Sequence, residues 1–368
     1  MKFLILILLL VSSVQAKTLE VMSYNVENLF DAQHDEGKND WTYMAKNAKG
    51  KKEACKKVSS NYRRKECLGT DWTEKKVQLK LSQIKKVILS KERGRLPEIL
   101  GLVEIENKNV IKKLAKVLGY KKLVVSDSPD RRGVDLAVLW KESKELKFIA
   151  KREHIVKGDY FKKRPTRNIL EVEFLIDGKY PLFTFVNHWP SLGNPDDARV
   201  VAATLLKGRI SEIAKKVKNY NIVAMGDFNT IPKLKKKGNK HPLNDVFLKN
   251  SPMFDMLTAF NSSKSVAKSA KDKLPPGTYF YKRGNQWNQL DRFFLSKGLV
   301  DGKGLEAELG SYSVYAPSFI RKTFDKKHEN KKSKSKLPAP PFRYNHQASK
   351  VKKAGYSDHF PIVFNLKF

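Results

Sequence analysis

Six short segments spread along the chain each join an apolar run to an acid, an amide or a histidine. They are SYNVENLF at 23–30, GLVEIEN at 101–107, VNHWPS at 186–191, MGDFNT at 225–230, QLDRFFLS at 289–296 and YSDHFPI at 356–362. Such runs are typical of buried strands that end in polar residues. A sheet holds the strand end still while the adjoining loop exposes it. One segment means little, but six predict an active site assembled from distant parts of the chain.

The stretches between these segments alternate between helical and strand patterns. Apolar residues at helical spacing predict a helix over about 74–91 and a second that ends at Gly119, and a third helix is expected over about 196–217. β-Branched and aromatic runs, separated by polar turns such as Asp177-Gly178, predict the strands. This order predicts an α/β fold of two packed sheets with helices outside. Because the six segments span the chain, we expect one domain over 17–368, with insertions.

The first residues, MKFLILILLLVSSVQA, have the pattern of a secretory signal peptide cut after Ala16. Their apolar run is shorter than the roughly 18 residues that a membrane span needs. An uncleaved anchor or a buried helix is the alternative. We therefore expect an exported protein, either secreted or periplasmic, and no later segment is apolar enough to span a bilayer.

The chain carries 73 Lys and Arg against 38 acidic residues, a net charge of +35. A charge of this size attracts polyanions and strengthens contacts with phosphates. Nucleic acid is therefore the expected partner, with DNA first and RNA second. A Lys-rich surface can instead serve solubility, and anionic membranes or envelope polymers would be attracted equally well.

Basic residues concentrate in three expected insertions, near 31–72, 233–276 and 321–353. The last holds twelve Lys and Arg against two acidic residues and has little apolar content, which predicts a mobile loop. It is either an arm on a nucleic-acid backbone or a solvated loop. The first insertion contains Cys55 and Cys67, which in an exported protein are expected to form a structural disulfide worth about 2–3 kcal/mol.

Several of the strand-end residues have the chemistry of a metal site. Hard cations such as Mg²⁺ take carboxylate and amide oxygens. Glu104 and Asp358 each end or adjoin an apolar strand and could meet at one sheet edge. Asn25 and Glu27, two apart on an alternating strand, are expected to face the same side and complete the shell. Any one of these residues alone would more often be a cap or solvated. Mg²⁺ is the expected cofactor, with Mn²⁺ or Ca²⁺ as alternatives.

Other strand-end residues suit the hydrolysis of a phosphate ester. Asp227 can accept a proton from water while Asn229 orients the attacked group, although Gly-Asp-Phe-Asn also suits an Asx-turn. His188 and His359 each lie where a strand meets a turn, and an imidazolium there would stabilise charge on phosphate oxygens. Asp291 could hold one of the two rings in the required tautomer.

Together these motifs resemble those of the endonuclease/exonuclease/phosphatase superfamily, the fold of DNase I and exonuclease III. The likeness is strongest to secreted bacterial members with SYNVENLFD, SPDRRG and NHWPS-type segments. It covers nearly the whole mature chain and implies a four-layer, DNase I-like α/β sandwich. In one position, Val103, the chain departs from the Gln that the family usually carries.

The resemblance implies a role for each candidate residue. It implies that Glu104 is the principal metal ligand, with Asn25, Glu27 and Asp358 at the same site. It implies that Asp227 and Asn229 activate water and contact phosphate, and that Arg167 also contacts phosphate. His188 and His359 would be the active-site histidines, with Asp135 as the partner of His188 and Asp291 orienting His359. The implied protein is a monomeric, metal-dependent phosphodiesterase, namely a nuclease. The alternatives are a phosphatase or sphingomyelinase-like enzyme on the same fold, or a polyanion-binding protein without activity.

Overall fold

A computed structural model describes residues 16–92, 94–234, 236, 238–322 and 339–368. Its strands form two six-stranded sheets. The first has the order β13 (Glu306–Val314), β14 (Ile362–Lys367), β1 (Thr18–Leu29), β2 (Ile99–Ile105), β4 (Asp135–Trp140), β3 (Lys122–Val125). The second has the order β5 (Leu146–His154), β6 (Ile169–Ile176), β7 (Tyr180–His188), β8 (Asn221–Asp227), β12 (Asp291–Ser296), β9 (Met253–Asp255). A separate hairpin joins β10 (Tyr279–Tyr281) to β11 (Gln286–Asn288).

Both sheets are mixed. β1 pairs in parallel with β2, and β7 pairs in parallel with β8, whereas the other pairings within the two sheets are antiparallel. Because the carboxyl ends of parallel neighbours lie at the same edge, the residues that end β1 and β2, and those that end β7 and β8, come together. This edge carries most of the polar strand ends that the sequence singles out.

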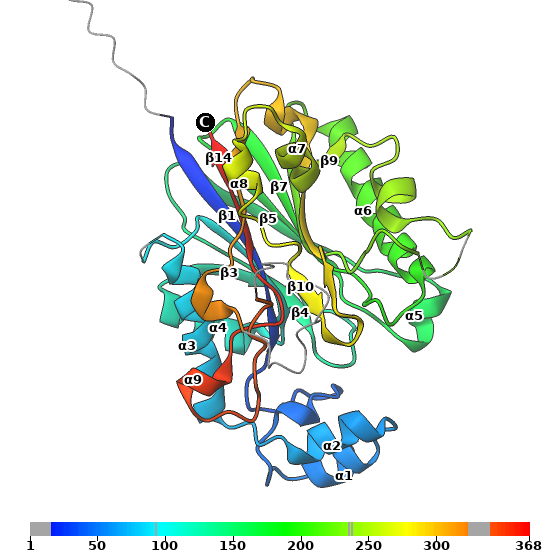
Figure 1. Cartoon of the computed structure of the whole chain (residues 1–368). Helices are drawn as coiled ribbons and strands as arrows, with labels where there is room; N and C mark the ends of the chain where they lie inside the picture. Colours follow the sequence, from blue (N-terminus) through cyan, green and yellow to red (C-terminus); the bar gives the residue numbers. More distant parts are fainter. Residues whose placement is uncertain (1–15, 93, 235, 237, 323–338) are drawn as a thin grey trace, which may run out of the picture.

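Helices cover the outer faces of the sheets, as Figure 1 shows. The longer ones are α3 (Glu74–Ser90) and α4 (Lys108–Leu118) beside the first sheet and α6 (Asp196–Lys216) beside the second. The shorter helices are α1 (Lys51–Lys56), α2 (Asn61–Gly69), α5 (Asp159–Lys163), α7 (Met256–Ser262), α8 (Lys268–Lys271) and α9 (Val351–Ala354). Single turns are η1 (Trp41–Tyr43), η2 (Pro242–Phe247), η3 (Lys282–Gly284), η4 (Lys297–Val300) and η5 (Ser318–Ile320).

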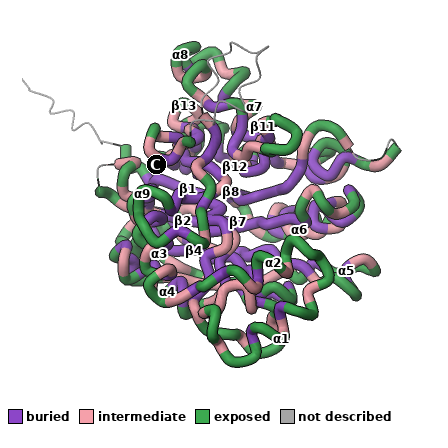
Figure 2. The backbone as a smooth tube through the Cα atoms, turned by 60° about the horizontal axis from the view of Figure 1, so that its bottom comes forward, coloured by how far each residue is buried: buried purple, intermediate pink, exposed green. Residues whose placement is uncertain are grey.

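The core has two parts, and β8 of the second sheet, which lies between them, is buried along its whole length (Figure 2). On β7, Val186 belongs to the larger cluster, which also contains Leu102 of β2. Its neighbour Phe185 belongs to the second cluster, with Ile210 of α6. Successive side chains of a strand point to opposite faces, so each sheet is packed on both sides. The predicted two-sheet, four-layer architecture is confirmed, and its three long helices end within a residue or two of the expected positions.

The expected insertion at 31–72 is more regular than its sequence suggests. It contains α1 and α2, although neither has a clear amphipathic stripe, and a disulfide joins Cys55 to Cys67. Buried Lys51 donates from Nζ to the carbonyls of Met44 and Thr70, each at 2.6 Å. The disulfide and this buried ammonium group supply contacts that short helices of low propensity lack by themselves.

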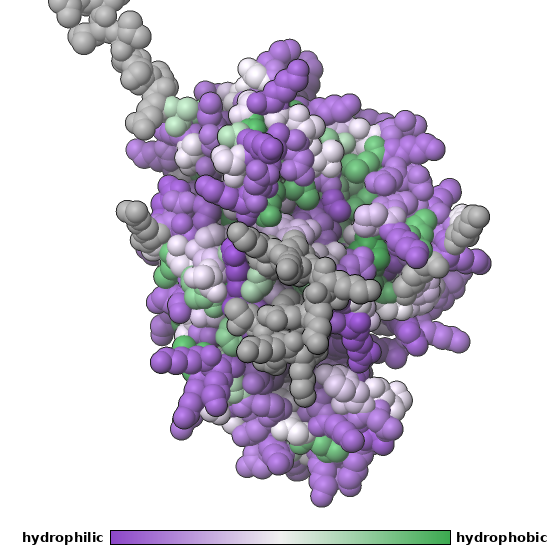
Figure 3. Space-filling model, in the orientation of Figure 1, coloured by the Kyte–Doolittle hydropathy of each residue, from purple (hydrophilic) through white to green (hydrophobic). Residues whose placement is uncertain are grey.

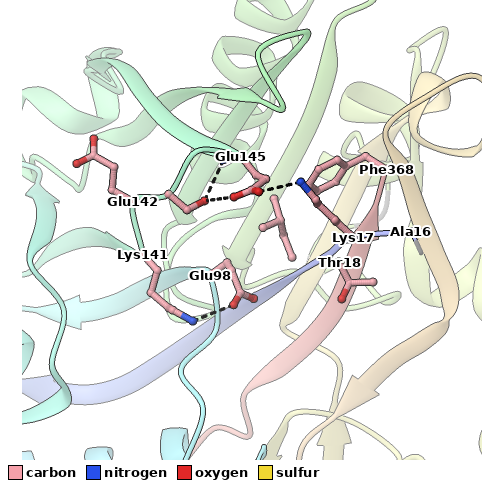
Figure 4. A pocket seen from close by; sticks show the side chains of 10 residues that line it. Ala16, Lys17, Thr18, Glu98, Lys141, Glu142, Glu145 and Phe368 are labelled. Atoms are coloured by element: carbon pink, nitrogen blue, oxygen red, sulfur yellow. Dashed lines mark hydrogen bonds and ion pairs between the residues drawn. The ribbon is translucent and has the colours of Figure 1, made fainter. Parts of the chain in front are cut away.

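The predicted signal peptide lies outside the described residues, except for Ala16. Positions 323–338 of the predicted basic loop 321–353 also lie outside them. Across the described chain, no helix is both long enough and apolar enough to cross a bilayer. A pocket of about 590 Å³ lies where residues 16–19 meet Phe368. Its acids Glu145 and Glu98 pair with the partly exposed Lys17 and Lys141, so neighbouring side chains balance their charges (Figure 4).

Candidate active site

Three buried polar residues form a row across the second sheet. His188, the last residue of β7, is the register partner of Asp227, the last residue of β8. Asp227 is in turn the partner of Asp291, the first residue of β12. The strands can approach here because position 226 is glycine: a Cβ atom on Gly226 would lie 2.1 Å from the carbonyl oxygen of Asn187. The sheet therefore fixes the three side chains side by side.

The first sheet brings a second group of polar residues to the same place. Asn25 of β1 donates from Nδ2 to Oδ2 of Asp227 over 3.3 Å. Glu104 of β2 lies with Oε1 3.6 Å from Nε2 of His188. His359, which precedes β14, donates from Nδ1 to Oδ2 of Asp291 over 2.7 Å. Residues from both sheets and from both halves of the chain thus meet at one site.

Asp227 lies between the two histidines. Its Oδ2 is 3.8 Å from Nε2 of His188 and 3.9 Å from Nε2 of His359. Its Oδ1 accepts a hydrogen bond from the backbone N–H of Asn229 at 2.8 Å. Asn229 has a φ of 45°, and its amide donates to the carbonyl of Trp189. The GDFN segment is therefore an Asx-turn that also delivers two polar side chains to the site.

Burial and neighbouring charges separate the protonation states of these groups. Burial raises the pKa of Asp227 to about 7, with Asp291 adding to the effect and His359 opposing it. Burial would lower the pKa of His359, but the carboxylates of Asp291, Asp358 and Asp227 raise it well above its usual value. Burial and nearby Arg167 hold the pKa of His188 well below its usual value. One imidazole is therefore charged and the other neutral at neutral pH.

Asp135 does not partner His188. Its Oδ1 accepts hydrogen bonds from the hydroxyls of Ser126 and Ser128, at 2.6 and 2.5 Å, so it ties the end of β3 to the start of β4. Nδ1 of His188 is buried and has no hydrogen-bond partner among the described residues. The resemblance suggested a residue with the right chemistry, but the local Ser-Asp-Ser sequence takes up its carboxylate.

Arg167 contacts the backbone that carries His188. Its Nε and Nη2 donate to the carbonyls of His188 and Trp189 at 3.1 and 2.7 Å, and its Nη1 pairs with Asp130 at 3.3 Å. The residue is only 6% exposed, and Nη1 and Nη2 each keep a second N–H beyond these contacts. The arrangement fixes the backbone at His188, and the contact of Arg167 with a substrate phosphate stays a prediction.

The remaining predicted metal ligands contact a residue that we did not foresee. Glu27 receives hydrogen bonds from Nε of Arg343 at 2.5 Å and from the backbone N–H of Tyr344 at 2.8 Å. Nη2 of Arg343 also lies 3.8 Å from Oδ2 of Asp358. Burial and the charge of Asp358 raise the pKa of Glu27 to about 8, against the opposing effect of Arg343. The acids Glu27 and Asp358 therefore share one site with the guanidinium of Arg343.

Around Glu27 and Glu104 the backbone departs from the regular alternation of side chains along a β-strand. Glu27 and Glu104 have φ values of 53° and 63°, in the left-handed region that non-glycine residues rarely adopt. The pairing of β1 with β2 shifts register between Asn25 and Leu29, and β2 shifts against β4 around Glu104. Regular strand alternation therefore does not hold between Asn25 and Glu27, and their joint role at a metal site stays a prediction. The backbone N–H of Glu27 donates to Asn25 Oδ1 at 3.0 Å.

The donor set has the chemistry of a site for a hard cation, because it consists of carboxylate and amide oxygens. Glu27 is a buried acid beside a second acid, Asp358, and such a pair needs a positive charge nearby. Among the described residues, however, no three His, Cys, Asp or Glu side chains converge closely enough to hold a metal ion. Arg343 supplies the positive charge in this arrangement.

Sequence reasoning missed Arg343 and Lys80. Lys80 of α3 is fully buried and donates from Nζ to the carbonyl of Tyr356 at 3.0 Å. Burial lowers its pKa to about 8, while the charges of Glu27 and Asp358 act in the opposite direction. One signal was available: Lys80 falls on the apolar face of its helix, between Val77 and Leu81. Arg343 had no such signal: it is the only Lys or Arg between Lys336 and Lys350, but a lone arginine in a proline-rich stretch does not indicate which acid it contacts.

A two-sheet α/β sandwich whose strand ends gather buried carboxylates and two buried histidines defines a class of phosphoester hydrolases. The sequence comparison agrees, since the model of the Endonuclease/Exonuclease/phosphatase family matches residues 20–367. The chain belongs to this family, whose members hydrolyse phosphoric ester bonds. No curated protein sequence matches the chain.

Solved structures with the same fold include three of particular interest. One is an endonuclease/exonuclease/phosphatase family protein from Bacteroides thetaiotaomicron, at 15% identity and TM-score 0.52, covering 96% of this chain and 99% of that one. A mannosyl-6-phosphatase of the same organism has 16% identity, TM-score 0.52 and coverage of 95% and 100%. TDP2 from D. rerio, in complex with a single-strand DNA product, has 13% identity, TM-score 0.52 and coverage of 95% and 98%. At these identities the likeness concerns the fold alone.

Proposed function

We propose that the protein is an exported, divalent-metal-dependent phosphodiesterase that hydrolyses DNA and, as a second substrate, RNA. The observation that carries the proposal is the position of Asp227. Its carboxylate lies within 4 Å of two buried histidines, of which His359 is charged and His188 is neutral. A base, a neutral imidazole and an imidazolium side by side are suited to removing a proton from water next to a developing negative charge.

In the proposed reaction, Asp227 accepts the proton of the attacking water. A pKa near 7 suits this role, because the carboxylate is then available at neutral pH and still basic enough to take a proton. His359, kept protonated by Asp291, stabilises the charge that grows on the non-bridging phosphate oxygens. The amide of Asn229 and the neutral ring of His188 orient the phosphate from the side of β7 and β8.

A divalent cation would be held by oxygens of Glu104, Asp358, Glu27 and Asn25. Mg²⁺ is the first choice because carboxylate and amide oxygens are its preferred protein ligands, and Mn²⁺ or Ca²⁺ would accept the same set. When bound, such an ion stabilises negative charge on the phosphate without a proton transfer. Glu104 and Asp358 are the most accessible of its acids, with side chains that are 19% and 20% exposed.

Charge favours nucleic acid over the alternative substrates. A net charge of +35 matches a polyanion better than a small phosphomonoester such as the substrate in the mannosyl-6-phosphatase's name. The face in Figure 3 is dominated by hydrophilic residues, and apolar ones are scattered among them. The exposed large apolar side chains, among them Tyr62, Ile149 and Val300, lie on separate elements. This is unlike the contiguous patch that a membrane-inserting lipid phosphodiesterase needs.

The test uses the purified protein on circular plasmid, RNA, a generic phosphodiester, a sugar phosphomonoester and sphingomyelin. Each is incubated with Mg²⁺, Mn²⁺, Ca²⁺ or EDTA, and His359→Asn is the control for contaminating nuclease. We expect nicking of the plasmid with a divalent ion, none with EDTA, and a steep loss of activity as salt rises. Hydrolysis of the monoester or of sphingomyelin alone would refute the nuclease assignment.

Export is tested separately by fractionating cells that express the full chain. The expected product begins at Lys17 and is found in the periplasm or the medium. An intact N-terminus in the cytoplasm would contradict this part of the proposal. Gel filtration of the same product should give the mass of a monomer.

A further inference from the structure

We propose that Arg343 is a built-in counter-cation of the metal site, which a divalent ion must displace from Glu27 in order to bind. This inference rests on the proposed function, since it assumes that the site takes a divalent cation. It goes further in assigning a role to a residue of the C-terminal basic segment. Arg343 competes with the metal in this role, and its charge sets how tightly the site holds the ion.

The first argument is the geometry of the contact. Nε of Arg343 lies 2.5 Å from Oε1 of Glu27, while Nη2 lies 3.8 Å from Oδ2 of Asp358. One guanidinium thus faces both acids, and these acids belong to the set that would hold a divalent ion. The Glu27 side chain is 1% exposed, whereas that of Arg343 is 68% exposed. The acid is therefore fixed inside the protein, and the cation reaches it from the solvent side and can leave.

The second argument is that the backbone around Arg343 is held firmly. The N–H of Tyr356 donates to the carbonyl of Phe342 at 2.7 Å. Gly355 has a φ of 70°, and a Cβ atom there would lie 2.1 Å from the carbonyl oxygen of Arg343. Only glycine allows these two backbones to pass so closely. These backbone contacts therefore hold Arg343 next to Glu27 and Asp358.

Lys80 further anchors the same segment and is not itself displaceable. Its Nζ lies 3.9 Å from the centre of the Tyr344 ring and donates to the carbonyl of Tyr356. Lys80 is fully buried, so it stays in place when the site is loaded. Tyr344 in turn donates its N–H to Glu27 at 2.8 Å. The mobile charge is therefore the exposed guanidinium of Arg343 alone.

Charge explains why the arginine and a metal ion exclude each other. Arg343 lies against Glu27 and Asp358, two of the acids that would hold the ion, and two cations at the same buried carboxylate repel each other. Metal binding must therefore break the charge-assisted hydrogen bond between Arg343 and Glu27. Without the arginine this cost disappears, so the metal should bind more tightly.

The experiment measures Mn²⁺ affinity by calorimetry and by electron paramagnetic resonance, at pH 8 and 0.15 M salt, without substrate. The variants are Arg343→Gln and, as a matched control, Lys353→Gln, which removes one exposed charge from the same basic segment. We expect Arg343→Gln to lower the Kd by about tenfold, the value of one charge-assisted hydrogen bond, and Lys353→Gln to leave it nearly unchanged. An equal or higher Kd in Arg343→Gln would overturn the inference.

A second readout uses the unaltered protein, so it does not depend on the folding of a variant. The Nε–H resonance of Arg343, followed by NMR in ¹⁵N-arginine-labelled protein, should shift as Mg²⁺ saturates the site, because its hydrogen bond to Glu27 is lost. An unchanged resonance at saturation would contradict displacement. If neither the parent protein nor Glu104→Gln binds any divalent ion, the proposed metal dependence fails instead, so the two failures are distinguishable.

Discussion

Nδ1 of His359 and Oδ2 of Asp291 are 2.7 Å apart, and both side chains are buried. The hydrogen bond joins the segment that precedes β14, in the first sheet, to the first residue of β12, in the second. It also keeps a proton on the imidazole, since a buried carboxylate favours the charged ring. One contact therefore fixes both the position and the charge of a proposed catalytic group.

Asp291→Asn should remove the charge that keeps His359 protonated while preserving the shape of the side chain. Carboxylate neighbours raise the pKa of His359 in the folded protein. Protonated His359 therefore stabilises the fold fully below its pKa in the unfolded chain, and this stabilisation is lost as pH rises through its pKa in the folded protein. In the variant this loss should begin at lower pH. We expect kcat/KM to fall by about 100-fold or more, with its alkaline limb shifted to lower pH. A pH–rate profile and the NMR titration of His359 measure this, and an unshifted limb would contradict it.

Asp227→Asn should abolish hydrolysis and yet stabilise the fold at alkaline pH. Burial raises the pKa of Asp227 to about 7, so its contribution to stability is complete below the unfolded value near 3.8 and is lost as pH rises through 7. The neutral amide avoids this loss. In EDTA, we expect the Tm of the variant to exceed that of the parent by roughly 2–4 °C at pH 8, and by less at pH 5. A variant less stable at pH 8 than at pH 5, relative to the parent, would be inconsistent with a buried charge.

Glu104→Asn should relieve backbone strain at the cost of metal binding. Glu104 has a φ of 63°, which costs about 1–3 kcal/mol for most residues and less for asparagine. We expect the variant to gain about 1 kcal/mol in free energy of unfolding and to lose Mn²⁺ affinity at least tenfold. Glu104→Gln, which loses the charge but keeps the strain, is the control and should lose affinity without gaining stability. Equal stability of the two variants would argue against strain at this position.

The paired substitution Cys55→Ser and Cys67→Ser should weaken the fold without affecting the chemistry. The disulfide closes a short loop around α1 and α2, for which chain entropy predicts a loss of about 2–3 kcal/mol in free energy of unfolding. Neither cysteine contacts the site residues. Denaturant titration measures the loss, and plasmid nicking should persist at its original rate below the midpoint. A loss of nicking in the folded variant would assign the insertion a direct part in catalysis.

The fold followed from the sequence to a large extent because its strands are buried on both faces. Runs such as NIVAMGD are apolar throughout and bounded by turn residues, which identifies a strand between two packed layers. Two of the long helices, α3 and α4, carry an apolar stripe, whereas the apolar residues of α6 are spread around the helix. The insertion at 31–72 lacked both signals, because its two short helices depend on the Cys55–Cys67 disulfide and on the buried Lys51. A local sequence pattern does not predict contacts between residues that are far apart in the chain.

The site shows the same limit. Strand-end acids and histidines could be found one segment at a time, and the structure brings His188, Asp227 and Asp291 into one row. The bulges at Glu27 and Glu104 could not be found, because a single positive φ leaves the composition of a strand unchanged. Arg343 was equally hidden, because a single arginine among Pro, aromatic and polar residues does not indicate that it reaches acids from distant strands.

The division of the site between the two sheets has a consequence for folding. The second sheet is one continuous length of chain, from Leu146 to Ser296, whereas the first combines strands from both sides of that length, within residues 18–140 and 306–367. Neither sheet carries the whole site, because His188, Asp227 and Asp291 lie on the second sheet and Glu104 lies on the first. A folding intermediate in which only one sheet has formed would therefore be inactive, so the recovery of activity during refolding reports the docking of the two sheets.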